Sequence, residues 1–370
     1  MNELKGEGSS MDIVEQLKQN STLTEDQFLE LIKTNDPTLR DSLFTAAQEA
    51  VTYLLERKVY LQGVLTFTNH CSRNCFYCEL RAENKDMKRY RMNWEQIRAA
   101  CAEGYHMGLR TFILEAGEDP YYTDMIMCNL LANLKEEFPD CALTLALGER
   151  SKASYTRLFK SGADRYLLRF ETADPLHFSR LHPPSYSLST KINCFNDIKE
   201  IGYETDTGFL VGAPYEMPDY LVRDLTLMQE LSPQSISLSP FVPQEGTSFR
   251  RHLPCGLETY LRLIAILRIM FPKANIAAPY RLKHVHPQGQ LMAVLAGANV
   301  LRVPIQPPRD MGDLPHLPHL PRVSLLRTLQ SLDMGLEPHG FQMVVDRGDS
   351  ALGKKVKRPD TPFPDTPFAE

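Results

Sequence analysis

Short apolar runs alternate with longer stretches of helical periodicity from residue 61 to residue 303. Apolar runs of this length, separated by helices, are typical of the buried strands of a parallel sheet. The chain therefore predicts an α/β fold, a TIM-type (β/α)8 barrel with its catalytic groups at the carboxyl ends of the strands. The predicted strands are Leu61 to Phe67, Thr111 to Glu115, Ala142 to Ala146, Arg165 to Arg169, Thr207 to Gly212, Ser235 to Ser239, Asn275 to Ala278 and Asn299 to Val303.

A helical pattern precedes the predicted barrel, over residues 11–58. Thr24 and Gln27 form a capping-box pattern before the first apolar pair, and a second amphipathic helix follows over residues 39–54. We expect this N-terminal helical extension to cover the bottom of a barrel formed by residues 59–305. Residues 1–10 are polar and glycine-rich, and we predict that they are disordered.

The region after the barrel divides into a C-terminal extension, residues 306–355, and a tail, residues 356–370. A proline-rich segment holds His316 and His319, and its extended character favours a surface loop over a metal site. A helix is expected from Arg322 to Met334, ended by Gly335. The tail repeats Asp-Thr-Pro-Phe and is predicted to be disordered.

Composition narrows the class of protein. The chain has 370 residues, 43% of them hydrophobic and 24% charged, which suits a large enzyme domain. A formal net charge of -5 gives no basic surface for nucleic acid, and no apolar run is long enough to cross a membrane. The 8 cysteines are clustered once and otherwise scattered, which is unlike a disulfide framework. We therefore predict a cytoplasmic protein that binds neither nucleic acid nor membrane.

The most informative motif is C-x3-C-x2-C, formed by Cys71, Cys75 and Cys78 directly after the first predicted strand, with Tyr77 before the last thiol. Three thiolates can each hold one iron of a [4Fe-4S] cluster, which leaves one iron without a protein ligand. Such an iron can chelate the amino and carboxylate groups of S-adenosylmethionine (SAM) and pass an electron to its sulfonium. The motif therefore predicts a radical SAM enzyme with both cofactors.

Two other interpretations of the cysteines stay open. A C-x2-C pair is a common half-site for structural zinc, which would make the protein a metal-binding assembly scaffold without catalysis. Zinc normally requires a second pair of ligands close by, whereas the next cysteine, Cys101, falls in a predicted helix. The cysteines could also be ordinary core residues that cluster by chance.

Polar residues follow the second and fourth predicted strands. After the second strand stands Gly117-Glu118-Asp119-Pro120, which is either a simple turn or a turn whose carbonyls meet a ligand ammonium. Arg169 and Glu171 lie at the end of the fourth strand, followed by Arg180. They form either a structural ion pair or a site for the carboxylate and ribose hydroxyls of a ligand.

The stretch from Cys71 to Met92, CSRNCFYCELRAENKDMKRYRM, closely resembles HydE, the radical SAM maturase family of [FeFe] hydrogenase. So do Gly117 to Tyr122, Ala163 to Ala173 and Gly202 to Thr205. Biotin synthase and methylornithine synthase (PylB) look like more distant relatives. The resemblance implies that Cys71, Cys75 and Cys78 bind the cluster. It also implies SAM contacts from the following residues: Tyr77, Gly117, Glu118, Asp119, Glu171 and Arg180.

The family's activity would be the construction of the diiron subcluster of hydrogenase. The resemblance implies reductive cleavage of SAM to a 5′-deoxyadenosyl radical, a reducing electron donor, and an organometallic substrate supplied by another maturase. Pro279-Tyr280-Arg281-Leu282 stands where HydE proteins typically have Thr-Thr-Ala-Met, and Phe209 stands where a small residue is expected. Phe209, Tyr280 and Arg281 are therefore predicted to line an altered substrate pocket. A PylB-like reaction on an amino acid or another small organic substrate is the alternative.

Overall fold

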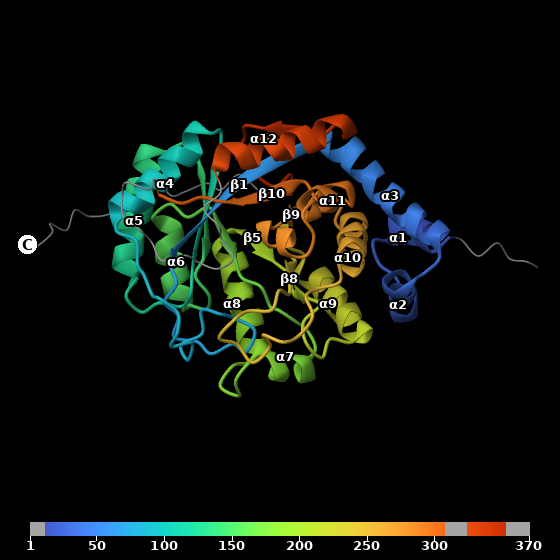
Figure 1. Ribbon diagram of the computed structural model, residues 1–370, viewed down its shortest axis with the longest axis horizontal. Helices are drawn as coiled ribbons and strands as arrows, with labels where there is room; N and C mark the ends of the chain where they lie inside the picture. The colour runs from blue at the N-terminus through green and yellow to red at the C-terminus, as the bar shows by residue number, and fades with distance from the viewer. Residues whose placement is uncertain (1–11, 308–323, 353–370) are drawn as a thin grey trace, which may run out of the picture.

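Parallel strands form a closed barrel in the computed structural model, which describes residues 12–307 and 324–352 (Figure 1). The predictions for residues 1–10, for His316 and His319, and for residues 356–370 lie outside these ranges. Within the described residues β10 pairs with β1 and closes the barrel. Its strands are β1 (Lys58–Thr68), β2 (Thr111–Ala116), β3 (Ala142–Ala146), β4 (Arg165–Leu167), β5 (Glu204–Thr207), β7 (Ser235–Ile236), β9 (Asn275–Ala278) and β10 (Val300–Pro304).

Helices connect the strands and surround the barrel (Figure 1). Asn93 begins the first of them with a capping box, in which the Asn93 and Gln96 side chains each accept from the other residue's backbone N–H. The predicted (β/α)8 barrel with an N-terminal helical extension is thereby confirmed. The connecting helices are α4 (Trp94–His106), α5 (Asp124–Glu137), α6 (Lys152–Lys160), α7 (Pro175–Leu181), α8 (Leu188–Ile201), α9 (Pro218–Leu231), α10 (Leu257–Met270) and α11 (Gly289–Leu295).

Two of the predicted strands are interrupted in the structure. The run from Thr207 to Gly212 divides into β5 and β6 (Leu210–Val211), and the run from Ser235 to Ser239 divides into β7 and β8 (Ser239–Pro240). The interruption lies at Gly208, where an added Cβ would stand 2.3 Å from the carbonyl oxygen of Ser237. The two backbones approach too closely there for a side chain, and β6 pairs with β8 beyond this point.

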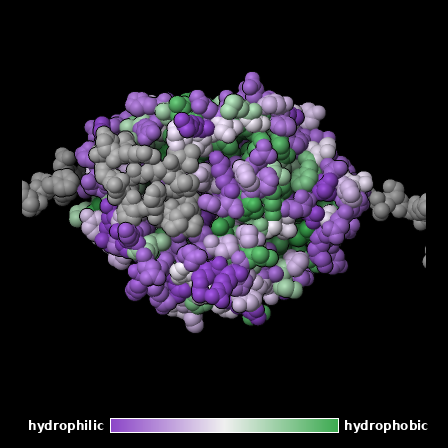
Figure 2. Space-filling model, viewed as in Figure 1, coloured by the Kyte–Doolittle hydropathy of each residue, from purple (hydrophilic) through white to green (hydrophobic). Residues whose placement is uncertain are grey.

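The N-terminal helices lie along the side of the barrel, which corrects the expectation that they cover its bottom. Here α1 (Ile13–Asn20) lies beside α3 (Pro37–Leu55), which packs along α10, while α2 (Glu25–Lys33) contacts α9 and α10 (Figure 1). The reason lies in α10, where every residue from Tyr260 to Met270 is buried. A largely apolar helix that is buried on all sides requires an outer cover, and α3 provides it. In Figure 2 the hydrophobic residues of this face gather around α10 and α11, while its rim is hydrophilic.

The bottom of the barrel is closed instead by the segment after β11 (Gln342–Val344). The Arg347 carbonyl accepts hydrogen bonds from Thr111 Oγ1 at 2.7 Å and Arg165 Nη2 at 2.9 Å, at the starts of β2 and β4. Asn275 Nδ2 donates to the Gly348 carbonyl at 2.8 Å, at the start of β9. This segment therefore crosses the amino ends of the strands and leaves the carboxyl ends as the open side of the barrel.

A last long helix, α12 (Leu325–Leu336), runs through the position at which it was predicted to end. Gly335 lies inside the helix, beside Leu291, and the chain continues as a 3-10 turn, Glu337–His339. Gly340, with a φ of +74°, ends that turn. No helix in the ranges 12–307 and 324–352 is long and apolar enough to cross a membrane.

Candidate active site

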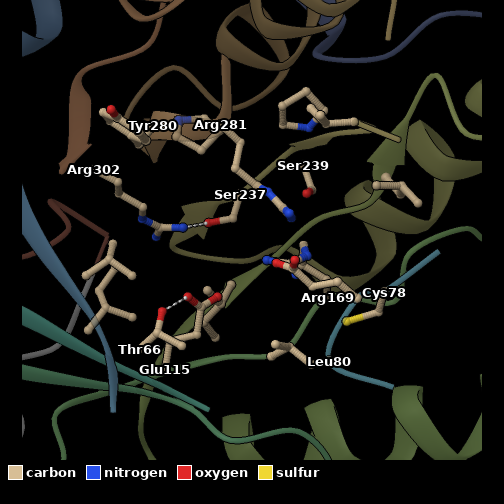
Figure 3. A pocket seen from close by; sticks show the side chains of 18 of the residues that line it. Thr66, Cys78, Leu80, Glu115, Arg169, Ser237, Ser239, Tyr280, Arg281 and Arg302 are labelled. Atoms are coloured by element: carbon tan, nitrogen blue, oxygen red, sulfur yellow. Dashed lines mark hydrogen bonds between the residues drawn. The ribbon is translucent and has the colours of Figure 1, made fainter. Parts of the chain in front are cut away.

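A cavity of about 290 Å³ lies at the carboxyl ends of the strands, between the barrel and the loop that follows β1 (Figure 3). Its lining brings together residues that are far apart in the sequence. Cys71, Tyr77, Cys78 and Gly117 line it from the loop side, and Tyr280 and Arg281 line it from the turn after β9. The position matches the end at which barrel enzymes place their chemistry.

The three motif cysteines are half-buried in one loop. Burial raises the pKa of the Cys75 and Cys78 thiols to about 12, and the negative charge of Cys71 adds to the rise at both. Thiols in such surroundings become thiolates when metal cations replace their protons. The donor set therefore fits an iron-sulfur cluster.

The three motif cysteines are not arranged around a single metal ion. In the part of the chain that the structure describes, no three His, Cys, Asp or Glu side chains form a site for one metal ion. A cubane cluster places each cysteine on a different iron, so its ligands need not converge on one point.

The cysteine loop is fastened to the turn after β2. The Ser72 backbone N–H and hydroxyl donate to the Glu118 carbonyl at 2.9 and 3.0 Å, and Arg73 Nε donates to the Glu118 carboxylate at 2.5 Å. Gly117 allows this approach, because an added Cβ would stand 2.4 Å from the His70 carbonyl oxygen and 2.5 Å from Cys71 Cβ. Loop and turn thus form one unit beside the cavity.

Asp119 completes this unit through its side chain. Its carboxylate accepts from Thr68 Oγ1 at 2.9 Å and from Arg91 Nε and Nη2 at 2.7 and 2.9 Å. Burial alone would raise the pKa of Asp119, but the hydrogen bonds from Arg91, Tyr121 and Thr68 hold that pKa below its ordinary value. The Glu118 and Asp119 side chains therefore hold the turn in place, and Gly117 is the residue of the turn that lines the cavity.

Glu171 combines a buried carboxylate with an unusual backbone. Its φ of 71° lies in the left-handed region, and the residue is 5% exposed. It stands just outside the cavity lining, to which its ion-pair partner Arg169 belongs. Arg169 Nε donates to Glu171 Oε1 at 3.3 Å, so the ion pair forms, but Oε2 is buried without a hydrogen-bond partner. A strained residue with an unused acceptor indicates a site for a ligand that donates hydrogen bonds, and the hydroxyls of a SAM ribose are suitable donors.

Comparison with known proteins agrees with this geometry. Residues 65–228 match the Radical SAM superfamily. The [FeFe] hydrogenase maturase subunit HydE of Thermotoga maritima is 34% identical over 78% of this chain and 82% of its own length. The chain belongs to the HydE family. Members of the radical SAM superfamily are enzymes that use a [4Fe-4S] cluster and SAM, and this HydE-family chain is a radical SAM enzyme.

The more distant relatives predicted from the sequence are also found. Biotin synthase of Yersinia pestis (strain Pestoides F) is 25% identical over 71% of this chain and 77% of its own length. The crystal structure of methylornithine synthase (PylB) superposes with a TM-score of 0.79 at 24% identity, covering 90% of this chain and 97% of that one. This likeness shows that the HydE-family chain and PylB share the fold.

Two of the predicted pocket residues line the cavity of this HydE-family protein, and the third does not. Tyr280 is 8% exposed, and Arg281 points into the cavity on the side of Ser237 and Ser239 (Figure 3). Phe209, by contrast, is fully buried in the core against Phe170, with ring centroids 5.8 Å apart. The structure places Leu210 at the cavity in its stead, because successive side chains of an extended strand face opposite sides.

The other predicted SAM contacts differ in position. Tyr77 lines the cavity, meets His182 edge-on with ring centroids 5.5 Å apart, and has its pKa raised well above the ordinary value by burial. Arg180 is exposed on α7, where its guanidinium lies 4.9 Å from the ring centroid of Tyr215. It is outside the cavity lining in this conformation, so its contact with SAM stays a prediction.

A buried polar group on the cavity floor was missed by sequence reasoning. Arg302 donates to Gln62 Oε1 at 3.0 Å and to Ser237 Oγ at 2.6 Å, and it forms an ion pair with Asp206. Gln62 and Arg302 are polar residues inside two apolar runs, and the barrel closure aligns them as neighbours on β1 and β10. The pairing of the first and last strands in the predicted barrel was therefore a signal from which the contact between Gln62 and Arg302 could have been found.

Proposed function

We propose that this protein is a HydE-type radical SAM enzyme that takes part in building the diiron active site of [FeFe] hydrogenase. The observation that carries the proposal is the cavity wall that the cysteine loop and the Gly117 turn form together. The unpartnered oxygen of Glu171 supports it, because the Glu171 carboxylate lies close enough to Cys75 and Tyr77 to raise the pKa of both. When bound, the cluster supplies an electron to the sulfonium of SAM, which yields methionine and a 5′-deoxyadenosyl radical. The proposal includes two kinds of partner, a reducing electron donor and other hydrogenase maturases. It also places the protein in the reducing cytoplasm.

The residues of this chain would act by holding and orienting the cofactors. Cys71, Cys75 and Cys78 would each bind one iron, and the turn at Gly117 would present backbone carbonyls to the SAM amino group. Glu171 would accept hydrogen bonds from the ribose hydroxyls through its free oxygen, while Arg169 fixes its orientation. The burial of Glu171 and the partial burial of the three cysteines would limit the access of water to the reacting atoms.

The substrate would occupy the part of the cavity that Tyr280 and Arg281 line. Arg302 already forms an ion pair with Asp206. Arg281 is half-buried, and the ordinary partner of such a guanidinium is a carboxylate or another anion. Arg281 also acts by its positive charge on Cys78, so it lies on the cluster side of the cavity. This added charge favours an anionic substrate, and it keeps an amino acid or another small organic anion as the second candidate.

Replacing Glu171 tests the SAM site. Glu171→Ala is expected to weaken SAM binding by roughly 1.5 to 3 kcal/mol, because it removes a charged hydrogen-bond acceptor for the ribose. Equilibrium dialysis of the anaerobic, cluster-loaded protein measures the affinity. Glu200→Ala, at an exposed glutamate of α8 that pairs with Lys152, is the control and is expected to bind SAM normally.

Arg180→Ala belongs in the same measurement, with the same expected loss of roughly 1.5 to 3 kcal/mol if Arg180 turns from Tyr215 to the SAM carboxylate. Normal SAM affinity in both Glu171→Ala and Arg180→Ala would show that the SAM site lies elsewhere, and the cluster assignment would be unaffected.

Complementation tests the substrate. A hydrogenase-maturation system that lacks its own HydE is expected to produce active hydrogenase when this protein is supplied. Failure by a protein that still cleaves SAM would favour the small organic substrate instead. Absence of SAM cleavage in a cluster-loaded protein would favour the non-catalytic scaffold.

Arg281→Ala is expected to lower substrate turnover strongly, while SAM cleavage without substrate stays nearly unchanged, because Arg281 binds the substrate rather than the cofactor. The two rates are measured side by side from product and 5′-deoxyadenosine. Lys283→Ala, two residues along the same turn, is the control and is expected to change neither rate. Equal loss of both rates in Arg281→Ala would show that Arg281 serves SAM or the fold.

A further inference from the structure

Arg89 lies under the cysteine loop and binds its backbone at both ends. Its Nη1 donates to the carbonyls of Asn69 and of Leu80, the latter at 2.9 Å. Its Nη2 donates to the carbonyls of Arg81 at 2.7 Å and Asn84 at 3.1 Å. Asn69 precedes the first motif cysteine, and the other three residues follow the last one. A single guanidinium thus ties together the two ends of the loop that carries all three thiols.

The charge of Arg89 is placed differently from that of its neighbours. Arg73 forms ion pairs with Glu118 and Glu149, and Arg91 forms one with Asp119. The four hydrogen bonds of Arg89, by contrast, go to neutral carbonyls. An arginine side chain stays protonated in proteins, so a full positive charge remains under the loop.

Burial and three negatively charged groups shift the pKa of Arg89. Burial lowers the pKa of Arg89, while Cys71, Cys78 and Glu79 raise it by their negative charges. Two of these three groups are motif cysteines. The positive charge is therefore close enough to the cysteine loop to influence the thiolates that would hold a cluster.

We propose that Arg89 is a positioning residue that fixes the cysteine loop at the spacing of the cluster, and that its charge makes the bound cluster easier to reduce. The inference rests on the proposed function, because it concerns the cluster on Cys71, Cys75 and Cys78. A cluster gains one negative charge when it is reduced, and a fixed cation nearby stabilises the reduced form. Net charge and hydrogen bonding around a cluster are the factors by which a protein sets its potential.

Two substitutions separate the two roles of Arg89. Arg89→Lys keeps the positive charge, but an ammonium cannot reach four carbonyls in the way that a planar fork does. Arg89→Met removes both the charge and the hydrogen bonds while filling similar space. We expect both variants to hold less iron than the unaltered protein, and we expect a more negative midpoint potential in Arg89→Met alone.

The experiment uses anaerobically reconstituted full-length protein. Iron and sulfide content measures cluster binding, and an EPR-monitored redox titration measures the midpoint potential. Hydrogen-deuterium exchange of residues 69–91 before reconstitution is expected to be faster in both variants, which reports on the loop even where little cluster binds. Lys85→Met is the control, since Lys85 is exposed in the same loop and donates to the Ala82 carbonyl at 3.0 Å.

The outcomes are distinct. Unaltered iron content and exchange in both Arg89 variants would overturn the positioning role, and equal midpoint potentials in Arg89→Met and the unaltered protein would overturn the charge role. A similar negative shift in Lys85→Met would also overturn the charge role, because any loop cation would then act alike. An unaltered protein that takes up no cluster would instead overturn the proposed function itself.

Discussion

Cys71→Ala, Cys75→Ala and Cys78→Ala are each expected to abolish the [4Fe-4S] cluster. The unaltered protein should take up about four irons and four sulfides on anaerobic reconstitution and turn brown. Removing one thiolate leaves two, which cannot hold a cubane with an open iron. SAM cleavage should fall to background in all three variants, as measured by 5′-deoxyadenosine released with dithionite as the reductant.

The other five cysteines provide matched controls for this experiment. They are Cys101, Cys128, Cys141, Cys194 and Cys255, and all five are free thiols in the structure. Cys101 and Cys141 are fully buried in the core, where they act as small apolar residues. Alanine at these positions is expected to leave the iron content unchanged. A colourless protein with one zinc per chain would contradict the cluster assignment and support a zinc scaffold.

The barrel could be predicted because its signals are local. The strand Ala142–Ala146 and the capping box at Thr24 were both expected and both occur, since each depends on residues that are neighbours in sequence. Parallel strands covered by helices on their outer side give apolar runs that differ clearly from the helices between them. The cysteine spacing predicted the cluster chemistry for the same reason, because the three cysteines are close together in the sequence.

The features of the site and the fold that could not be predicted depend on contacts between distant segments of the chain. Asp119 was expected to contact SAM as part of the turn after β2, and its carboxylate accepts hydrogen bonds from Arg91 and Thr68, whose approach depends on how the cysteine loop folds back. The closure of the barrel bottom by residues near Gly348 likewise depends on strand starts spread over the whole chain. Phe209 was assigned to the pocket because the family has a small residue there, whereas its side chain packs in the core against Phe170.

Gly117→Ala is expected to damage the cluster site as severely as the loss of a ligand, although alanine has no charge and only one added methyl group. That methyl group would meet the His70 carbonyl oxygen at 2.4 Å and Cys71 Cβ at 2.5 Å, and both belong to the cysteine loop. Backbone cannot rotate away as a flexible side chain can, so the loop itself must move. Overpacking of this kind costs about 1 to 3 kcal/mol, and here the displacement falls on a cluster ligand.

The measurement is iron content together with thermal unfolding of the protein before reconstitution. Gly256→Ala is the control, because the nearest atom to an added Cβ there is Thr259 Oγ1 at 3.8 Å and the backbone is compatible with any residue. We expect Gly117→Ala to keep a folded barrel but to lose most of its iron, and Gly256→Ala to match the unaltered protein in both. Full iron content in Gly117→Ala would show that the loop and the turn move independently, and the single unit proposed for the SAM site would then be wrong.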